Sequence, residues 1–150
     1  MDKKYRVTWK QYIKAIDDLY LQIKLSKKTY KGIFGIARGG LIPAAVLSYK
    51  LNIPLVESVT GNEALDILFV DDICDSGETL SWIIANGKID SAVVYAKRSG
   101  PTFISKMISK DIWIKMPYDS PTDTVSIKTE DFYEELRKRN KDKTILKYKK

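Results

Sequence analysis

The stretch from Ile67 to Leu80 constrains the fold of this 150-residue chain more than any other. It opens with four apolar residues, Ile67–Val70, as a buried strand of a parallel sheet would. Two adjacent carboxylates, Asp71 and Asp72, follow where that strand should end, and a turn of small residues around Gly77 then leads into a second apolar run. The order strand, turn, helix predicts one unit of an open α/β sheet.

A turn of this kind offers a ligand several contacts. Ligands of open α/β sheets bind in the crevice at the carboxyl ends of the strands, and a small-residue turn that opens a helix presents backbone N–H groups to a phosphate. The carboxylates of Asp71, Asp72 and Asp75 suit ribose hydroxyls or Mg²⁺. Acid pairs also follow strands in response regulators and phosphatases, and D-D-x-x-D occurs on a long helix in prenyltransferases, but Ile67–Val70 and Gly77 disfavour a helix here. The loop therefore predicts a sugar-phosphate site.

Strands and helices alternate along the rest of the chain. In order, the patterns predict a helix after the capping-box pair Thr8 and Gln11, a strand at Ile33–Ile36, a helix at Leu41–Leu51, a strand near Leu55–Val59, a strand at Ile67–Asp71, a helix at Thr79–Asn86, a strand at Ala92–Ala96, a short strand or extended segment at Ile112–Ile114, and a helix from Thr129 to about Asn140. This alternation predicts an α/β fold with a doubly wound, mostly parallel sheet flanked by helices.

Composition narrows the class of protein. The chain can bury one core, and no apolar run is long enough to cross a membrane. The first four residues contain no apolar signal region, and the single cysteine, Cys74, cannot form an internal disulfide, so a cytoplasmic protein is expected. We expect Cys74 to be a small apolar filler, because the acids around it disfavour a thiolate. The chain has no histidine, so acid–base chemistry must use carboxylates, lysine, tyrosine or cysteine.

The net charge of +7 belongs to one end of the chain. Residues 137–150 hold eight basic residues and one acid, which leaves 18 basic and 18 acidic groups in residues 1–136. We therefore predict a neutral domain, 1–136, followed by a basic tail, 137–150. A solvated end is the expected role of the tail, and binding of nucleic acid or another polyanion is the alternative.

The pattern V-D-D-I-x-D-S-G-x-T resembles the phosphoribosyl-pyrophosphate (PRPP) binding signature of type I phosphoribosyltransferases. The chain is most similar to the bacterial xanthine-guanine branch of that family. Four further segments carry the resemblance in the right order: Tyr5–Trp9, Gly32–Pro43, Tyr95–Lys97 and Trp113–Asp119. The signature is specific because it fixes three acids, a glycine and a hydroxyl residue after a strand.

The resemblance implies a reaction and its setting. A 6-oxopurine base (guanine, xanthine or hypoxanthine) would react with PRPP in purine salvage, giving the nucleoside monophosphate and pyrophosphate with Mg²⁺ as cofactor. The reaction passes through an oxocarbenium-like sugar and places new negative charge on pyrophosphate, so catalysis rests on positioning and charge stabilisation. A cytoplasmic homo-oligomer, dimer or tetramer, is also implied.

The resemblance assigns the PRPP contacts residue by residue. Asp71 and Asp72 would address the ribose hydroxyls and the Mg²⁺ environment, with Asp72 as a metal ligand, and Asp75 would be the acid–base group near purine N7. These three acids form the expected catalytic set. The 5′-phosphate loop would comprise Asp75, Ser76, Gly77, Glu78 and Thr79. The pyrophosphate loop would comprise Arg38 and Gly39, with a non-proline cis peptide at Ala37–Arg38, although a simple strand–helix turn is the alternative there.

The base would be held by a second group of residues. Lys97 would donate to the purine 6-oxo group, Trp113 would cover one face of the base, and the Ile114 backbone would contact its 2-position edge. Asp119 would lie at the pyrophosphate and second-metal side. The alternatives are that Lys97 is a surface lysine, that Trp113 is a core residue and that Asp119 is a turn residue.

Two departures separate the chain from the family pattern. Only Ser58–Ala64 stands where the family carries a long hood with a Ser-Tyr pair, and Lys115 and Met116 replace an acid and an amide. Because lids exclude water and complete active sites, the short segment leaves a second hypothesis open. That alternative is a PRPP- or nucleotide-binding regulator with little or no catalysis, which could bind nucleic acid through its tail.

Overall fold

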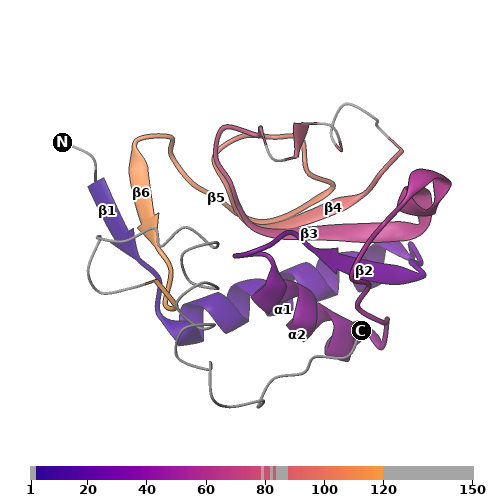
Figure 1. Ribbon diagram of the computed structural model, residues 1–150. Helices are drawn as coiled ribbons and strands as arrows, with labels where there is room; N and C mark the ends of the chain where they lie inside the picture. Colours follow the sequence, from indigo (N-terminus) through magenta and orange to yellow (C-terminus); the bar gives the residue numbers. More distant parts are fainter. Residues whose placement is uncertain (1–2, 79, 82, 84–87, 120–150) are drawn as a thin grey trace, which may run out of the picture. The chain divides into compact units, whose positions relative to one another are not determined.

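The computed structural model describes residues 3–78, 80, 81, 83 and 88–119 and divides the chain into one unit from Met1 to Pro117 and another from Tyr118 to Lys150. All of the elements defined here belong to the first unit (Figure 1). They are β1 (Lys3–Arg6), α1 (Trp9–Ser26), β2 (Gly32–Gly35), α2 (Leu41–Leu51), the 3₁₀ helix η1 (Gly61–Asp66), β3 (Ile67–Cys74), β4 (Ser91–Ala96), β5 (Phe103–Met107) and β6 (Ile112–Lys115). The predicted last helix and the boundary after residue 136 lie outside the described residues.

The main sheet contains four parallel strands in the order β2-β3-β4-β5. Leu55 forms an isolated parallel bridge with Ile33 on the outer side of β2, which is all that the described chain retains of the strand predicted near Leu55–Val59. The chain thus leaves β2 in one direction, through α2 to Leu55, and continues on the other side of β2 in β3. The strand order therefore reverses between β2 and β3, which is where open α/β sheets bind ligands.

Both α1 and α2 cover the same face of this sheet (Figure 1). The α1 helix contacts β4 and β5, α2 contacts β2 and β3, and the two helices contact each other. The predicted capping box begins α1: the Thr8 N–H donates to Gln11 Oε1 at 2.9 Å, and the Gln11 N–H donates to Thr8 Oγ1 at 3.1 Å. One face of α1 is buried at helical spacing by Tyr12, Ala15, Ile16, Leu19 and Ile23.

An apolar cluster includes residues from β3 and β4 and from the segments beside them. Its buried members are Ala64, Ile67, Phe69, Cys74, Leu80, Ile83, Ile89, Val93 and Ala96. Ala64 belongs to η1, so the short connection that stands in place of a hood is anchored to the core by this residue. Of the helix predicted at residues 79–86, Ser81 and Ile83 are helical, and most of the others are not described.

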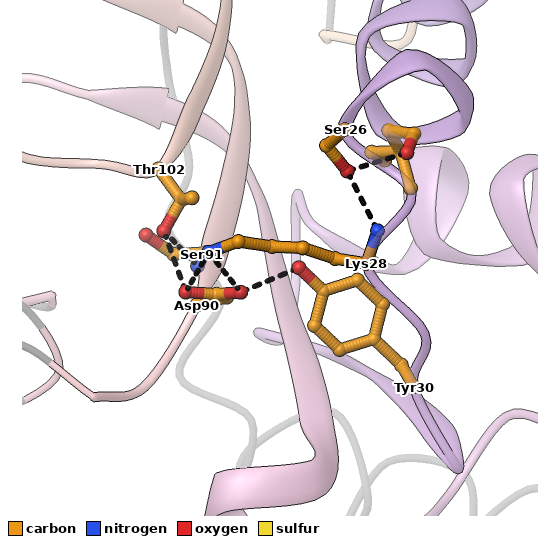
Figure 2. A network of polar contacts seen from close by, with 7 residues as sticks. Ser26, Lys28, Tyr30, Asp90, Ser91 and Thr102 are labelled. Atoms are coloured by element: carbon orange, nitrogen blue, oxygen red, sulfur yellow. Dashed lines mark hydrogen bonds and ion pairs between the residues drawn. The ribbon is translucent and has the colours of Figure 1, made fainter.

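Asp90 makes polar contacts that join three connections at the amino ends of the main-sheet strands (Figure 2). Its carboxylate accepts from Tyr30 OH at 2.6 Å and lies 3.1 Å from Lys28 Nζ, and Thr102 Oγ1 lies 3.4 Å away. Burial and the adjacent carboxylate raise the pKa of Tyr30, so this phenol stays a hydrogen-bond donor. The network fixes the amino end of the sheet, opposite the end at which a ligand would bind.

Two short strands form a separate sheet, in which β1 pairs with β6 in parallel. The sequence predicted β6 as a short strand at Ile112–Ile114, but it predicted neither β1 nor β5. The β3 strand is longer than predicted, because it continues to Cys74 instead of ending at Asp71. Among the described helices, none is both long and apolar enough to span a membrane.

Candidate active site

The second half of β3 carries the two adjacent acids. Asp71 pairs with Val93 of β4 and is only 9% exposed, whereas Asp72 is half-buried. The Asp72 backbone N–H donates to Asp71 Oδ1 at 2.8 Å. Burial, reinforced by the neighbouring Asp72 carboxyl, nevertheless raises the pKa of Asp71 to about 7. The pair therefore holds less negative charge at neutral pH than two solvated aspartates would.

The β2–α2 turn passes directly over this acid pair. A Cβ atom on Gly39 would overlap the Asp72 carboxylate, and one on Gly40 would overlap the Val70 carbonyl. Both glycines are therefore needed for the turn to approach β3. The peptide bond between Ala37 and Arg38 is cis, as the resemblance implied.

The turn and the end of β3 enclose a cavity of about 300 Å³ at the reversal of strand order. Its lining comprises Ile36, Ala37, Arg38, Gly39, Asp71, Asp72, Ile73, Cys74, Asp75, Ser76, Gly77 and Leu80. Seven of the predicted PRPP-binding residues thus share one cavity, although two chain segments more than 30 residues apart supply them. Of the two others, Glu78 is exposed and donates its N–H to Ser76 Oγ at 3.3 Å, and Thr79 lies outside the described residues.

Lys97 reaches the same loop from the end of β4. Its side chain is 6% exposed and its Nζ lies 3.4 Å from Asp75 Oδ2, while its backbone N–H donates to the Cys74 carbonyl at 2.8 Å. A surface lysine is therefore the wrong interpretation. The structure brings the predicted base-contacting lysine beside the predicted acid–base carboxylate, which belongs to a different strand–turn unit.

The remaining predicted residues are not among those that line the cavity. Trp113 on β6 is 58% exposed, which excludes a core tryptophan, and the next residue, Ile114, is buried. Asp119 is exposed and belongs to the unit that begins at Tyr118. The roles given to Trp113, Ile114 and Asp119 stay predictions. Cys74 is buried in the apolar cluster, and this burial raises the pKa of its thiol, in agreement with its expected role as a filler.

The sequence interpretation missed Arg98. Its guanidinium donates to the Ser76 carbonyl of the loop after β3. An exposed arginine in a turn carries no sequence signal of such a contact. The pairing of β3 with β4, which brings residue 98 next to residue 76, is a property of the folded sheet alone.

Asp71 makes a prediction about stability. Because its folded-state pKa of about 7 exceeds the unfolded value of about 3.9, the folded state binds more protons between these values, and stability is lost as pH rises through that window. We expect Asp71→Asn to unfold at higher urea than the unchanged chain at pH 9, with a gain on the order of 2 kcal/mol, and to show no gain at pH 4. Equal stability of the variant and the unchanged chain at pH 9 would contradict the raised pKa of the buried Asp71 carboxyl.

Comparison with known proteins connects this cavity to an enzyme family. No family model matches the chain. A xanthine-guanine phosphoribosyltransferase of Nitratidesulfovibrio vulgaris is 35% identical over 142 residues, covering 79% of this chain and 86% of that protein. One of Idiomarina loihiensis is 30% identical over 143 residues, covering 79% and 88%.

A solved structure shows the same fold. The purine phosphoribosyltransferase of Pyrococcus horikoshii superposes with a TM-score of 0.65 at 26% identity, covering 81% of this chain and 98% of that one. By sequence similarity over most of its length and by its fold, the chain belongs to the xanthine-guanine phosphoribosyltransferase family.

Proposed function

We propose that the protein joins a 6-oxopurine base to PRPP, giving the nucleoside monophosphate and pyrophosphate in cytoplasmic purine salvage. One observation carries the proposal: the cavity at the carboxyl ends of β2 and β3 combines an acid pair, a glycine turn and a small-residue loop in a chain of this family. Guanine, xanthine and hypoxanthine are the candidate bases, and formation of nucleotide from PRPP and each of them is the test.

The cavity residues suit the three parts of PRPP. Backbone N–H groups of Asp75–Gly77 would bind the 5′-phosphate, as small-residue loops do. Asp71 and Asp72 would accept from the ribose hydroxyls. Gly39, which admits close backbone approach, and Arg38, which supplies charge, would hold pyrophosphate. Each contact orients the sugar carbon for attack, and those at pyrophosphate strengthen as negative charge develops on the leaving group.

Mg²⁺ is the cofactor that we propose for this site. The described residues form no group of three or more side chains that could hold a metal by themselves. Mg²⁺ commonly takes one or two carboxylates and completes its shell with water and substrate phosphates, so Asp72 with Asp71 fits it, and Asp119 is proposed for a second ion. When bound, the ion would offset the negative charge of the carboxylates and the pyrophosphate.

The base would enter beside Asp75 and Lys97. Lys97 has only donors, so it would donate to the 6-oxo group, and Asp75 would exchange the proton of purine N7. Trp113 is 58% exposed, which leaves its ring available for stacking on the base, with the Ile114 backbone beside it. In these assignments the acid–base and donor groups are a carboxylate and a lysine, which is consistent with a chain that has no histidine.

One observation favours the regulator as a second candidate. The connection before β3 contains the short 3₁₀ helix η1, which buries Ala64 in the apolar cluster, so this segment is too short to form a hood over the site. A protein that binds PRPP or nucleotide without rapid turnover would need no such closure. The assay at the end of the Discussion separates the two candidates.

The role of Lys97 predicts discrimination between bases. Adenine presents an amino donor where the accepted bases present an oxo group, so a buried donor would face a donor. We expect kcat/KM for adenine to be at least about 100-fold below that for hypoxanthine. In Lys97→Gln the amide can donate or accept. This variant should therefore have a lower kcat/KM for hypoxanthine and a smaller difference in kcat/KM between hypoxanthine and adenine. Efficient conversion of adenine by the unchanged chain would refute the assignment.

A further inference from the structure

Arg98 lies on the outside of the proposed phosphate loop. It is an exposed residue directly after Lys97, and its Nη1 donates to the Ser76 carbonyl at 2.5 Å. Its side chain also covers Gly77, because a Cβ atom on Gly77 would meet Arg98 Cδ, Nη1 and Cζ at 3.1, 3.2 and 3.3 Å. Arg98 therefore contacts both residues of one peptide group.

The peptide between Ser76 and Gly77 has a fixed internal geometry. In a planar trans peptide the carbonyl and the N–H point in opposite directions, so a carbonyl held toward Arg98 turns the Gly77 N–H away from it. Gly77 has a φ of 80°, a conformation that favours glycine. Within the described part of the chain, the Gly77 N–H has no hydrogen-bond partner.

Both residues of this peptide line the cavity, whereas Arg98 is not one of the lining residues. An N–H without a protein partner in a small-residue turn attracts an anion, and several such groups together make a phosphate site. We propose that Arg98 is a positioning residue, which holds the Ser76–Gly77 peptide so that the loop presents its N–H groups to the 5′-phosphate of PRPP. This inference rests on the proposed function and adds to it a residue outside the cavity.

The geometry of the guanidinium distinguishes this role from a general effect of charge. Arginine offers a planar fork of donors that can lie over the peptide while one nitrogen donates to the carbonyl, whereas lysine supplies one compact charge on a flexible stem. Arg98→Lys therefore keeps the charge and loses the geometry, and Arg98→Ala loses both. Lys88→Ala is the matched control, because it removes one exposed charge from the turn that precedes β4.

The test measures binding of ribose 5-phosphate, PRPP and pyrophosphate to the full chain by calorimetry, with thermal unfolding as a check on folding. We expect Arg98→Ala to weaken ribose 5-phosphate and PRPP by about 10- to 100-fold, the range for a lost hydrogen bond from a charged group. Pyrophosphate binding should stay within about twofold, Arg98→Lys should resemble Arg98→Ala, and Lys88→Ala should bind like the unchanged chain. In turnover, the KM for PRPP should rise more than kcat falls.

Three results would overturn the inference: unchanged ribose 5-phosphate binding in Arg98→Ala, equal weakening of pyrophosphate, or full retention of binding in Arg98→Lys. A failure of the proposed function looks different. In that case the unchanged chain binds ribose 5-phosphate but forms no nucleotide from any base, and the comparison of Arg98 variants still decides the positioning role. If the unchanged chain binds neither ribose 5-phosphate nor PRPP, both are wrong.

Discussion

We expect replacement of both Asp71 and Asp72 by asparagine to weaken PRPP binding by at least about 100-fold, because hydrogen bonds from the ribose to charged groups and the metal contacts vanish together. The two carboxylates line one cavity, and the Asp72 carboxylate lies against Gly39 of the glycine turn. Titration of PRPP in the presence of Mg²⁺ measures the effect directly.

The folded state of the double variant should persist, because asparagine keeps the acceptor that Asp71 offers to the Asp72 N–H and removes a costly buried charge. Asp66→Asn is the matched control, since Asp66 directly precedes β3 at its other end and is exposed. That control should bind PRPP normally. Undiminished binding in the folded double variant would show that the cavity is not the PRPP site.

The second large effect concerns Asp75. We expect Asp75→Asn to lower kcat by about 10²- to 10⁴-fold while PRPP still binds, because a positioned acid–base group contributes in that range. Its carboxylate lies 3.4 Å from Lys97 Nζ, so the same substitution also removes the ionic partner of that lysine. Single-turnover measurement at saturating PRPP and base separates the chemical step from binding.

Asp66→Asn serves again as the control and should turn over normally. Loss of PRPP binding in Asp75→Asn would assign this residue to the phosphate loop alone. An unchanged kcat in Asp75→Asn would show that Asp75 is not the acid–base group, and another group would then have to exchange the proton of purine N7.

The sequence predicted the parts of the site that follow one another along the chain. The run from Ile67 to Gly77 has strand, acid and turn residues in an order with few structural alternatives. The α2 helix was predicted with the bounds that it has, because its apolar run is flanked by a glycine and by Asn52, which adopts the left-handed conformation that ends it.

What the sequence left open depends on contacts between distant segments. The β1 strand, Lys3–Arg6, is exposed throughout and has no alternating pattern, so only its pairing with β6 makes it a strand. The contact of Arg98 with Ser76 arises from the pairing of β3 with β4. The raised pKa of Asp71 comes from burial, which no local pattern reveals.

One assay tests the central claim most directly. The unchanged chain is incubated with PRPP, Mg²⁺ and guanine, xanthine or hypoxanthine in turn, and nucleotide and pyrophosphate are quantified together, with Asp75→Asn as the reference for background. The proposed function predicts equal amounts of both products for at least one base, and a large fall in Asp75→Asn. PRPP binding by calorimetry with no nucleotide from any of the three bases would contradict it and favour the regulator.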